Sequence, residues 1–504
     1  MAVDILILSA NWFAFRMDEV DRHGRSQIPG KGDGKMYSFN GARAVYLSRS
    51  LGPEKISWRI RQAGYTCQVL SFVHYYSDQQ FKDLIAKFVG PKTIVAVSSV
   101  FIQDQPSIQA IADIFKRYVP KQNKTMIGGQ GALIWSDIIK RTFNYEFDYV
   151  INGFAENDIV AFMHKHFNNG IQKKNIPFWE ITSCNFRWSR DAFVFPTEAL
   201  PLETARGCIF ECKFCRYNML GKKKGTYVRS MELIREELIH NYNMFGTTDY
   251  MMTDDTFNDT PDKIEAWAEM IATLPFKIRY VAYIRADLLH RFPHTVPLLK
   301  DSGLVSAHFG IETIHPKASK TIGKGWSGKH ARDYVPYVRD VLWKNDVLVH
   351  VSLIAGLPYE TMKDWDVTKR WVEENKIDGF IRALDVRLKS RNMLEETDSK
   401  NGTSIFDREA EKYGYKMRQT GGATDVWEIN GITYWDALKY CIQANYDWTP
   451  FVRAAHYVGF EMTSIGVPWE TIMTTPKIQL MSDWSLYQRT ANMVDQYVEK
   501  ILSL

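Results

Sequence analysis

The sequence predicts an α/β fold built from two series of alternating strands and helices, followed by a mainly helical region. Short β-branched and apolar segments alternate with amphipathic segments in the first third of the chain and again from about residue 202, which is typical of parallel sheets. From about Glu395 the alternation stops, and the composition becomes polar and then helical. For 504 residues, at about 150 residues per domain, we expect three domains, at 1–175, 195–394 and 395–504.

The first series contains five strand candidates. A helical stretch at 108–118 lies between two of them, and Gly128, Gly129 and Gly153 lie just after strand ends, where open α/β sheets bind ligands. Residues 11–41 are rich in Gly, Lys, Arg and Asp, and we expect them to form a long loop or lid over the carboxyl edge of the sheet. The strand candidates are 3–9, 66–72, 93–100, 124–127 and 149–151.

The second series contains six strand candidates. Amphipathic stretches such as 231–242 and 264–271 lie between them, so each strand is followed by a helix. Six β/α units in this order predict a partial or open parallel barrel. The strand candidates are 202–205, 250–253, 278–283, 305–309, 348–355 and 380–384.

The C-terminal region is predicted to be helical and rich in aromatic residues. A final helix is indicated by apolar residues at helical spacing, for which packing is the ordinary role: Tyr487, Ala491, Val494, Val498 and Ile501. The aromatic residues could line a substrate cavity or stack on a base, although packing in the core is their more common use. They are Tyr413, Tyr415, Trp427, Trp435, Trp448, Trp469 and Trp484.

Composition excludes several classes of protein. Hydrophobic residues make up 45% and charged residues 24%, as in ordinary folded proteins. The net charge of +5 is small for this length and does not indicate nucleic-acid binding. The first residues do not resemble a signal peptide, and the longest apolar run, near 93–101, is far shorter than the roughly 20 residues that span a bilayer. Six cysteines are too few for a secreted disulfide framework. We therefore expect a cytoplasmic protein without a membrane partner.

Three of the six cysteines form a compact motif. Cys208, Cys212 and Cys215 lie within eight residues, and no fourth cysteine is nearby. Three thiolates at this spacing can hold three corners of an iron–sulfur cluster and leave one iron open for a ligand. Zinc is the alternative, but a zinc site normally takes four ligands, for example from two Cys-x-x-Cys pairs, and this chain has no second cysteine pair. Three unconnected buried thiols are a further alternative.

The cysteine motif and the segments after it resemble the radical S-adenosylmethionine (SAM) superfamily. The motif follows the first strand of a β/α series and includes a Phe just before its last Cys. Further matches occur in the expected order at the ends of the next strands. They are Arg229-Ser230, Asp254 to Phe257, Arg285 to Asp287, Gly310 to Glu312, and Gly356 to Thr361.

This resemblance implies the cofactors and the reaction. The three cysteines would hold a [4Fe–4S] cluster whose fourth iron is chelated by the amino and carboxylate groups of SAM. An electron passing from the cluster to SAM would produce a 5′-deoxyadenosyl radical, which abstracts hydrogen from an unactivated position. A low-potential electron donor such as flavodoxin or ferredoxin is implied as a partner. Lys222, Lys223 and Lys224 follow the cysteine loop and could bind a reductase or an anionic substrate, although a solvated loop is their more common role.

The resemblance also assigns a SAM site. A helix N-cap is the alternative role for the two aspartates, and a structural ion pair is the alternative for Arg285 and Glu312. The implied contacts are Phe214 and Gly356 with the adenine, Asp254 and Asp255 with the amino group, Arg285 with the carboxylate, and Glu312 with the ribose.

The N-terminal α/β domain resembles the Rossmann-like domain of the cobalamin-binding subfamily. The similar segments are Gly64-Tyr65 with Leu70, Ser98-Ser99, Gly128-Gly129, and Tyr149 to Glu156. The resemblance implies that the nucleotide tail of cobalamin lies near Ser98, Gly128 and Gly129, where close backbone approach requires glycine.

One part of that resemblance is incomplete. Proteins that ligate cobalamin through histidine carry Asp-x-His-x-x-Gly, whereas this chain has Asp21-Arg-His23 with Ser26 in place of the glycine. We interpret the half-motif as a chance match in a charged loop. A domain that keeps the fold without the cofactor is the alternative to cobalamin binding.

The combined interpretation is a cobalamin-dependent radical SAM methyltransferase that acts on an unactivated carbon of a small molecule or natural product. The first alternative is a radical SAM cyclase, rearrangement enzyme or other oxidoreductase whose N-terminal domain is only a scaffold. The second is a non-catalytic iron–sulfur, electron-transfer or zinc protein, which would not need the SAM-site motifs.

Overall fold

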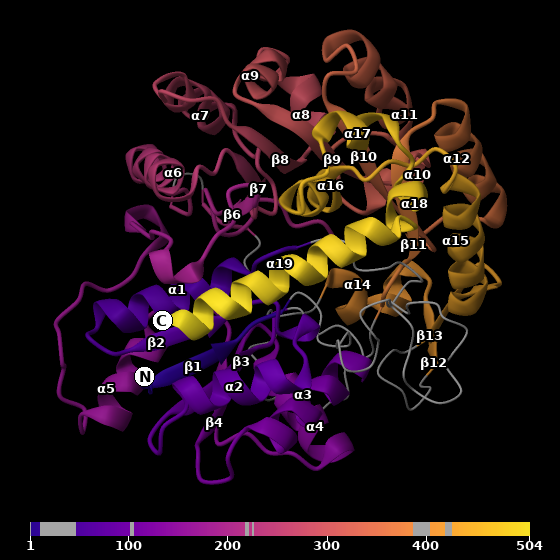
Figure 1. The fold of residues 1–504 in the computed structure, drawn as a ribbon. Coiled ribbons are helices and arrows are strands. Elements are labelled where there is room, and N and C mark those ends of the chain that lie inside the picture. The colour runs from indigo at the N-terminus through magenta and orange to yellow at the C-terminus, as the bar shows by residue number, and fades with distance from the viewer. Residues whose placement is uncertain are drawn as a thin grey trace.

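The computed structural model describes residues 2–10, 47–100, 105–216, 221–223, 226–386, 404–418 and 426–504. This part of the chain forms a five-stranded and a six-stranded parallel sheet and a small antiparallel sheet (Figure 1). The predicted α/β class, the partial barrel and the mainly helical C-terminal region are confirmed. None of the described helices is long and apolar enough to cross a membrane.

The N-terminal sheet is parallel, with strand order β2-β1-β3-β4-β5. In this order the chain reverses its direction of winding between β1 and β3, which is the place where such sheets bind ligands. The strands are β1 (Ile5–Leu8), β2 (Cys67–Leu70), β3 (Ile94–Ser98), β4 (Thr125–Gly129) and β5 (Tyr149–Asn152). The helices are α1 (Leu51–Gln62), α2 (Asp78–Phe88), α3 (Gln105–Tyr118), α4 (Ala132–Phe143) and α5 (Asp158–Phe167).

Helices cover both faces of this sheet, and successive side chains along each strand point alternately to one face and the other. Ile5 and Ile7 of β1 belong to one core, together with Ile60 of α1. Leu6 and Leu8 belong to a second core, which includes residues of α2, α3 and α4. Strands that are buried on both faces read as continuous apolar runs, which is why the sequence reveals them clearly.

The second sheet is an open parallel barrel with strand order β11-β10-β9-β8-β7-β6. Helices α6 to α12 cover its outer face. The strands are β6 (Leu200–Leu202), β7 (Asp249–Met252), β8 (Arg279–Ile284), β9 (Leu304–Glu312), β10 (Leu348–Ala355) and β11 (Asp378–Ala383). The helices are α6 (Met231–Phe245), α7 (Pro261–Ala272), α8 (Ala286–Arg291), α9 (Thr295–Asp301), α10 (Pro316–Thr321), α11 (Gly328–Tyr337) and α12 (Met362–Glu374).

The C-terminal region contains helices and an antiparallel sheet that was not expected. The turn between its last two strands is Asn430-Gly431, with φ of 52° and 75°. The strands are β12 (Lys416–Arg418), β13 (Val426–Ile429) and β14 (Ile432–Thr433). The helices are α14 (Ile405–Arg408), α15 (Tyr434–Trp448), α16 (His456–Ser464), α17 (Trp469–Thr474), α18 (Lys477–Met481) and α19 (Trp484–Ser503).

The predicted packing roles in this region are largely confirmed. All five residues of the predicted apolar face of α19 are buried. Trp427 and Trp448 are fully buried and Trp469 is nearly so, whereas Trp435 is 61% exposed. Core packing is therefore the observed role of Trp427, Trp448 and Trp469, but not of Trp435.

Two C-terminal helices connect the sheets. Helix α16 lies against the concave face of the barrel, where Tyr457 donates a hydrogen bond to the carbonyl of Met252, and the backbone N–H of His456 donates to Ser306 Oγ over 2.9 Å. Helix α19 runs across the N-terminal sheet (Figure 1), and the hydroxyl of its Tyr497 lies 3.1 Å from the backbone N of Ser71. One hydrophobic core contains residues of both parallel sheets and of these two helices. The predicted domain boundaries, at 1–175, 195–394 and 395–504, remain a prediction.

Candidate active site

The predicted motifs meet at the carboxyl ends of successive barrel strands. The cysteine loop follows β6, and Asp254 follows β7. Arg285 follows β8, Glu312 ends β9, and Gly356 follows β10. Because parallel strands place their carboxyl ends at one edge of the sheet, these residues surround a common space.

The cysteine loop holds its thiols close to the barrel. Cys208 and Cys212 are buried, and Cys215 is half-buried. The backbone N–H of Cys215 donates to the carbonyl of Cys212 over 2.9 Å, and Cys208 Sγ lies 3.6 Å from Thr256 Oγ1. Burial raises the pKa of the Cys208 thiol, and the charge of Asp255 adds a smaller effect in the same direction.

Among the described residues, no group of three or more Cys, His, Asp or Glu side chains converges on one point that could hold an ion. A structural zinc ion requires four ligands around such a point. In a [4Fe–4S] cluster each thiolate binds a different iron, so the thiols need not converge.

Asp254 is fully engaged within the protein. Its Oδ1 accepts from the backbone N–H of Thr204 over 2.8 Å and of Ala205 over 3.1 Å. Its Oδ2 accepts from the Thr204 hydroxyl and from Lys263 Nζ, the latter over 2.8 Å. A carboxylate offers about four acceptor positions, and all of those of Asp254 are used. These contacts also end β6 before Thr204 and explain why the strand does not continue to 205 as expected.

Asp255 lies in a different environment from its neighbour. Its side chain is exposed next to the cysteine loop, whereas Asp254 is 1% exposed. Neither residue is the N-cap of α7, which is Thr260. Of the two, Asp255 is therefore the better placed to contact a ligand amino group, and this contact remains a prediction.

Arg285 uses its guanidinium for several internal contacts. Nε and Nη2 donate to the two carboxylate oxygens of Asp287, over 3.0 and 2.8 Å. Nη2 also donates to the carbonyl of Lys324 over 2.7 Å, and Nη1 donates to Cys212 Sγ over 3.6 Å. The guanidinium carbon lies 3.8 Å from the centre of the Phe210 ring. The structure thus contains the ion pair that was the alternative for Arg285, and contact with a SAM carboxylate remains a prediction.

Glu312 has one carboxylate oxygen with no partner among the described residues. Its backbone has a φ of 65°, an uncommon left-handed conformation. Oε1 lies 3.4 Å from Lys324 Nζ, whereas Oε2 is buried without a hydrogen bond. A buried polar atom of this kind indicates a missing partner, and a ribose hydroxyl would supply one. Phe214 is half-buried nearby, with Lys324 Nζ 5.9 Å from its ring centre.

At Gly356 the close neighbour is a tryptophan of the C-terminal sheet. Gly356 has a φ of 96°, and a Cβ at this position would lie 2.2 Å from Trp427 Cη2. Trp427 is anchored by a hydrogen bond from Nε1 to the carbonyl of Leu384 over 2.7 Å, and Tyr415 donates to the carbonyl of Gly356 over 2.9 Å. The need for glycine here is explained by Trp427, and the predicted approach to adenine is untested.

The predicted cobalamin residues lie together at the carboxyl edge of the N-terminal sheet. Ser98 ends β3, and Gly128 and Gly129 end β4. Among the described residues, a Cβ on Gly128 would have only the carbonyl oxygen of Ile151 within 4 Å, at 3.7 Å. Gly129 has a φ of 107°, and its Cβ would crowd Val100 at 3.2 Å. Open space in front of Gly128 fits a ligand that passes close to the backbone.

Exposed apolar side chains surround that edge. Val100, Leu133, Ile134 and Phe154 are each at least 40% exposed, and they follow the carboxyl ends of β3, β4 and β5. A group of exposed apolar side chains next to an open glycine edge is typical of a binding surface. The Asp21-Arg-His23 segment and the predicted lid at 11–41 lie outside the described residues, as does Lys224.

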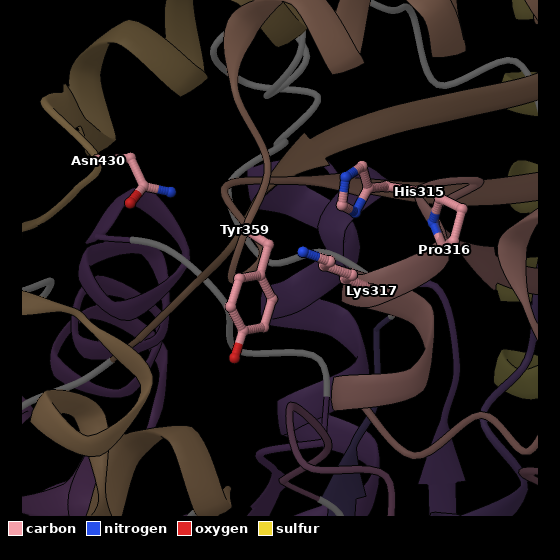
Figure 2. Close-up of a pocket in the computed structure, with 5 residues that line it drawn as sticks. All are labelled: His315, Pro316, Lys317, Tyr359 and Asn430. Carbon is pink, nitrogen blue, oxygen red and sulfur yellow. The ribbon is translucent and has the colours of Figure 1, made fainter.

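Figure 2 shows a cleft at the rim of the barrel, next to the SAM-site loops. Its volume is about 460 Å³. Tyr359 is 58% exposed with a φ of 72°, and His315 accepts the backbone N–H of Ala318 through Nδ1. None of the predicted site residues lines it. The lining residues are His315, Pro316, Lys317, Tyr359 and Asn430.

Sequence reasoning missed two residues of the site, Lys263 and Lys324, and it named Trp427 only as an aromatic residue that could pack in the core, line a substrate cavity or stack on a base. Each acts through a contact with a residue far along the chain or in a different element. Lys263 is the only one with a local signal, since it lies four residues after Asp259 and also pairs with it, at 3.4 Å.

Comparison with known proteins identifies part of the chain by sequence. Residues 202–372 match the model of the radical SAM superfamily. An uncharacterized methyltransferase of Pyrococcus horikoshii is 27% identical over 176 residues, which is 35% of this chain and 37% of that protein. The bacteriochlorophyllide d C-8(2)-methyltransferase of Chlorobaculum tepidum is 23% identical over 322 residues, covering 60% of this chain and 67% of that protein.

A solved structure matches nearly the whole chain. The radical SAM methyltransferase TsrM of Kitasatospora setae, solved with tryptophan and a SAM analogue, is 13% identical and covers 98% of both chains with a TM-score of 0.59. A second structure of that enzyme, with cobalamin and a [4Fe–4S] cluster bound, covers 77% of this chain and 73% of its own, with a TM-score of 0.51. At this identity the likeness shows that the folds are the same.

Proposed function

We propose that this chain, whose residues 202–372 match the radical SAM superfamily, is a cobalamin-dependent methyltransferase that acts on an unactivated carbon of a small molecule. The observation that carries this proposal is the pairing, in one chain, of a superfamily barrel with a five-stranded sheet whose carboxyl edge is open at Gly128. The methyltransferase names of the relatives agree with it.

In this proposal Cys208, Cys212 and Cys215 hold a [4Fe–4S] cluster, which supplies the electron that cleaves SAM. The donor set fits, because the three thiols share one loop and no single-ion site competes for them among the described residues. Glu312 Oε2 is the acceptor that we assign to the ribose, since it is buried and has no hydrogen-bond partner among the described residues. Asp255 holds the amino group from its exposed position next to the loop.

The N-terminal sheet holds cobalamin along the edge formed by Ser98, Gly128 and Gly129. When bound, this cofactor supplies a methyl carrier. The protein's own contribution is shape: Gly128 leaves room for the nucleotide tail, and the exposed apolar side chains that follow β3, β4 and β5 exclude water from the ring of the cofactor.

The electron donor is a low-potential protein such as flavodoxin or ferredoxin. A reducing, cytoplasmic compartment would suit the six free cysteines of the chain. Neither a membrane nor a nucleic acid is needed by the proposed reaction.

Anaerobic reconstitution tests the proposal. Protein produced with hydroxocobalamin should contain both cobalt and a four-iron cluster, and on reduction with SAM it should release 5′-deoxyadenosine. With methyl-deuterated SAM, the label should appear on the bound cobalamin. Tryptophan, which was bound as substrate in the TsrM structure, is the first substrate to test. A folded, iron-loaded protein that never takes up cobalt would contradict the proposal and favour the scaffold-only alternative.

A further inference from the structure

An arginine at the start of the cysteine loop pairs with a carboxylate of the N-terminal domain. Arg206 lies two residues before Cys208, and its Nη1 is 2.7 Å from Oε1 of Glu156. Glu156 lies between β5 and α5, at the carboxyl edge of the N-terminal sheet. The two side chains are only 7% and 6% exposed. A buried ion pair therefore joins the edge where we place cobalamin to the loop where we place the cluster.

The guanidinium of Arg206 is held from several directions. Its Nε and Nη2 donate to the two carboxylate oxygens of Glu203, over 2.7 and 3.0 Å. Its central carbon lies 4.4 Å from the ring centre of Phe154 and 4.5 Å from that of Trp179. A planar cation in contact with two carboxylates and two rings has a fixed orientation. Lysine, which presents a point charge, could not reproduce this set of contacts.

The other charges around this pair leave Glu156 dependent on Arg206. Lys55 of α1 forms an ion pair with Glu203, and Arg59 donates from Nε to the backbone carbonyl of Glu156 over 3.2 Å. Burial alone would raise the pKa of Glu203, but the charges of Lys55 and Arg206 lower it to about 2. Among the described residues, no cation other than Arg206 forms an ion pair with the Glu156 carboxylate. Removing Glu156 therefore breaks the link between the domains and leaves Glu203 paired.

A displacement of Arg206 reaches the first thiol directly. One residue separates Arg206 from Cys208, and two residues of chain span at most about 7 Å. The backbone N–H of Arg206 donates to the carbonyl of Tyr227 over 3.0 Å, and the carbonyl of Cys208 accepts from the backbone N–H of Lys222 over 3.2 Å. The conformation of the loop around Cys208 thus depends on where Arg206 is held.

We propose that Glu156, acting through Arg206, is a positioning residue for the cysteine loop, so that the N-terminal domain helps to set the geometry of the cluster site. This inference rests on the proposed function, since it concerns the cluster and the SAM that binds to it. Asp254 holds the loop from the barrel through the backbone of Thr204 and Ala205. Glu156 holds it from the other domain, and without Glu156 the loop is fixed on one side only.

Glu156→Ala tests the link by a change in the N-terminal domain alone. In the cluster-loaded full chain, the dissociation constant of SAM should rise at least about 5-fold by calorimetry, at the lower end of typical couplings between sites. The EPR signal of the reduced cluster with SAM should broaden, because the loop occupies a wider range of positions. An unchanged dissociation constant would overturn the inference. If this variant does not fold, Glu156→Gln keeps the size and one acceptor oxygen, and it should show a smaller change in the same direction.

The matched control lies at the opposite end of the same strand. Asp148 precedes β5, accepts from Lys124 Nζ over 2.6 Å and from the backbone N–H of Thr125 over 2.8 Å, and so pairs within its own sheet. Asp148→Ala removes a paired carboxylate from the same domain. It should leave both the dissociation constant of SAM and the EPR signal as in the wild type.

A double variant tests whether Glu156 acts through the guanidinium. Arg206→Met should weaken SAM binding at least as much as Glu156→Ala, because it also removes the contacts with Glu203 and the two rings. Arg206→Lys, which keeps the charge, should restore part of the affinity. Glu156→Ala combined with Arg206→Met should bind SAM no more weakly than Arg206→Met alone. Losses that multiply in the double variant would mean that Glu156 acts by another route, and would overturn the inference.

Hydrogen exchange gives a readout that needs no cofactor. The backbone N–H groups of Thr204 and Ala205 donate to Asp254, and that of Arg206 donates to Tyr227. Mass spectrometry of peptides that contain these amides should show faster exchange in Glu156→Ala and wild-type exchange in Asp148→Ala. Unchanged exchange in Glu156→Ala would overturn the inference. Failure of the proposed function is distinct, because the wild type would then bind no cluster or SAM, whatever the exchange of these amides.

Discussion

Lys263 Nζ lies 2.8 Å from Oδ2 of Asp254, and both side chains are almost completely buried. Asp254 also accepts the backbone N–H groups of Thr204 and Ala205, at the start of the loop that carries the cysteines. The position of the cysteine loop therefore depends on an ion pair that also anchors helix α7.

Removing that carboxylate should destabilise the protein. Asp254→Ala leaves Lys263 buried with only Asp259 at 3.4 Å, and breaking a buried pair in this way costs about 3–5 kcal/mol. Urea unfolding should show a lower midpoint. Asp255→Ala is the matched control: its stability should stay near that of the wild type, while calorimetry shows weaker SAM binding. Wild-type stability in Asp254→Ala would mean that the loop is held by other contacts.

The cluster prediction concerns three of the six cysteines. Alanine at Cys208, Cys212 and Cys215 together should abolish the iron content, the visible absorption and the EPR signal of reconstituted protein, because no other thiols share their loop. Alanine at Cys67, Cys184 or Cys441, tested singly, should retain the cluster. A cluster that remains in the triple variant would contradict the prediction and would indicate that Cys67, Cys184 or Cys441 binds it.

The two glycines of the N-terminal site should respond differently. Gly128→Val should fold, because among the described residues its side chain would meet open space, yet it should lose cobalamin because that space is where we place the nucleotide tail. Gly129→Val should also lose stability, since its φ of 107° is strained for valine. Gly52→Val, at another glycine with open surroundings, controls for the added bulk, and His23→Ala should keep the cofactor. Cobalt and iron are counted separately. A cobalt content in Gly128→Val equal to that of the wild type would show that the nucleotide tail does not pass Gly128.

Glu360 should make stability depend on pH. Burial raises its pKa from 4.5 to about 7, against smaller opposing effects of hydrogen bonds from Thr313 and Trp365. The native state then holds a proton that the unfolded state has lost, so this contribution is present below pH 4.5 and disappears as the pH rises through about 7. The change is roughly 3 kcal/mol at most.

Glu360→Gln mimics the protonated carboxyl and should remove that part of the pH dependence. Glu54 and Glu461 also have a pKa of about 7 and titrate in both proteins, so the difference between the two stability curves isolates Glu360. Parallel curves from pH 4.5 to 8 would show that Glu360 is ionised in the native state.

Gly356 and Trp427 should behave as a coupled pair. Gly356→Ala places a methyl group against the indole, and Trp427→Ala removes a fully buried ring, at a cost of about 3–5 kcal/mol. In the double variant the clash is absent, so the combined loss should be smaller than the sum by about 1–3 kcal/mol. Chemical denaturation of all four proteins measures it. Simple additivity would mean that the glycine is needed for a reason other than Trp427.

The architecture could be predicted because its strands carry a local signal. Strands β1 and β3 are almost continuous apolar runs, and the helices between strands have an apolar face. The C-terminal sheet was missed because its strands have only three, four and two residues, too few to show alternation. A local signal was nevertheless present, since Asn430-Gly431 is a typical hairpin turn.

The site was predictable in position but not in detail. The order of motifs after successive strands placed Cys208, Arg285 and Glu312 at one edge of the barrel. It could not show that all acceptor positions of Asp254 are occupied within the protein. Thr204 and Ala205 lie about 50 residues earlier and Lys263 lies on the next helix, so these contacts depend on the fold. Nor could it bring His456 to Ser306, 150 residues earlier, since contacts of this range depend on how whole elements pack.

The bond between Tyr497 and Ser71 spans 426 residues of chain, and it has a consequence for biosynthesis. At about 5–20 residues per second, the first sheet waits on the order of a minute on the ribosome before α19 is made to cover it. Helices α2, α3 and α4 can pack on the same face of the sheet early, but Phe72, whose ring lies 5.3 Å from that of Tyr497, lacks this partner for all of that time, and exposed hydrophobic surface is what chaperones bind. A chain truncated before α19 would contain all six cysteines but would lack the helix that contacts Phe72, so we expect it to bind chaperones more strongly than the full sequence does.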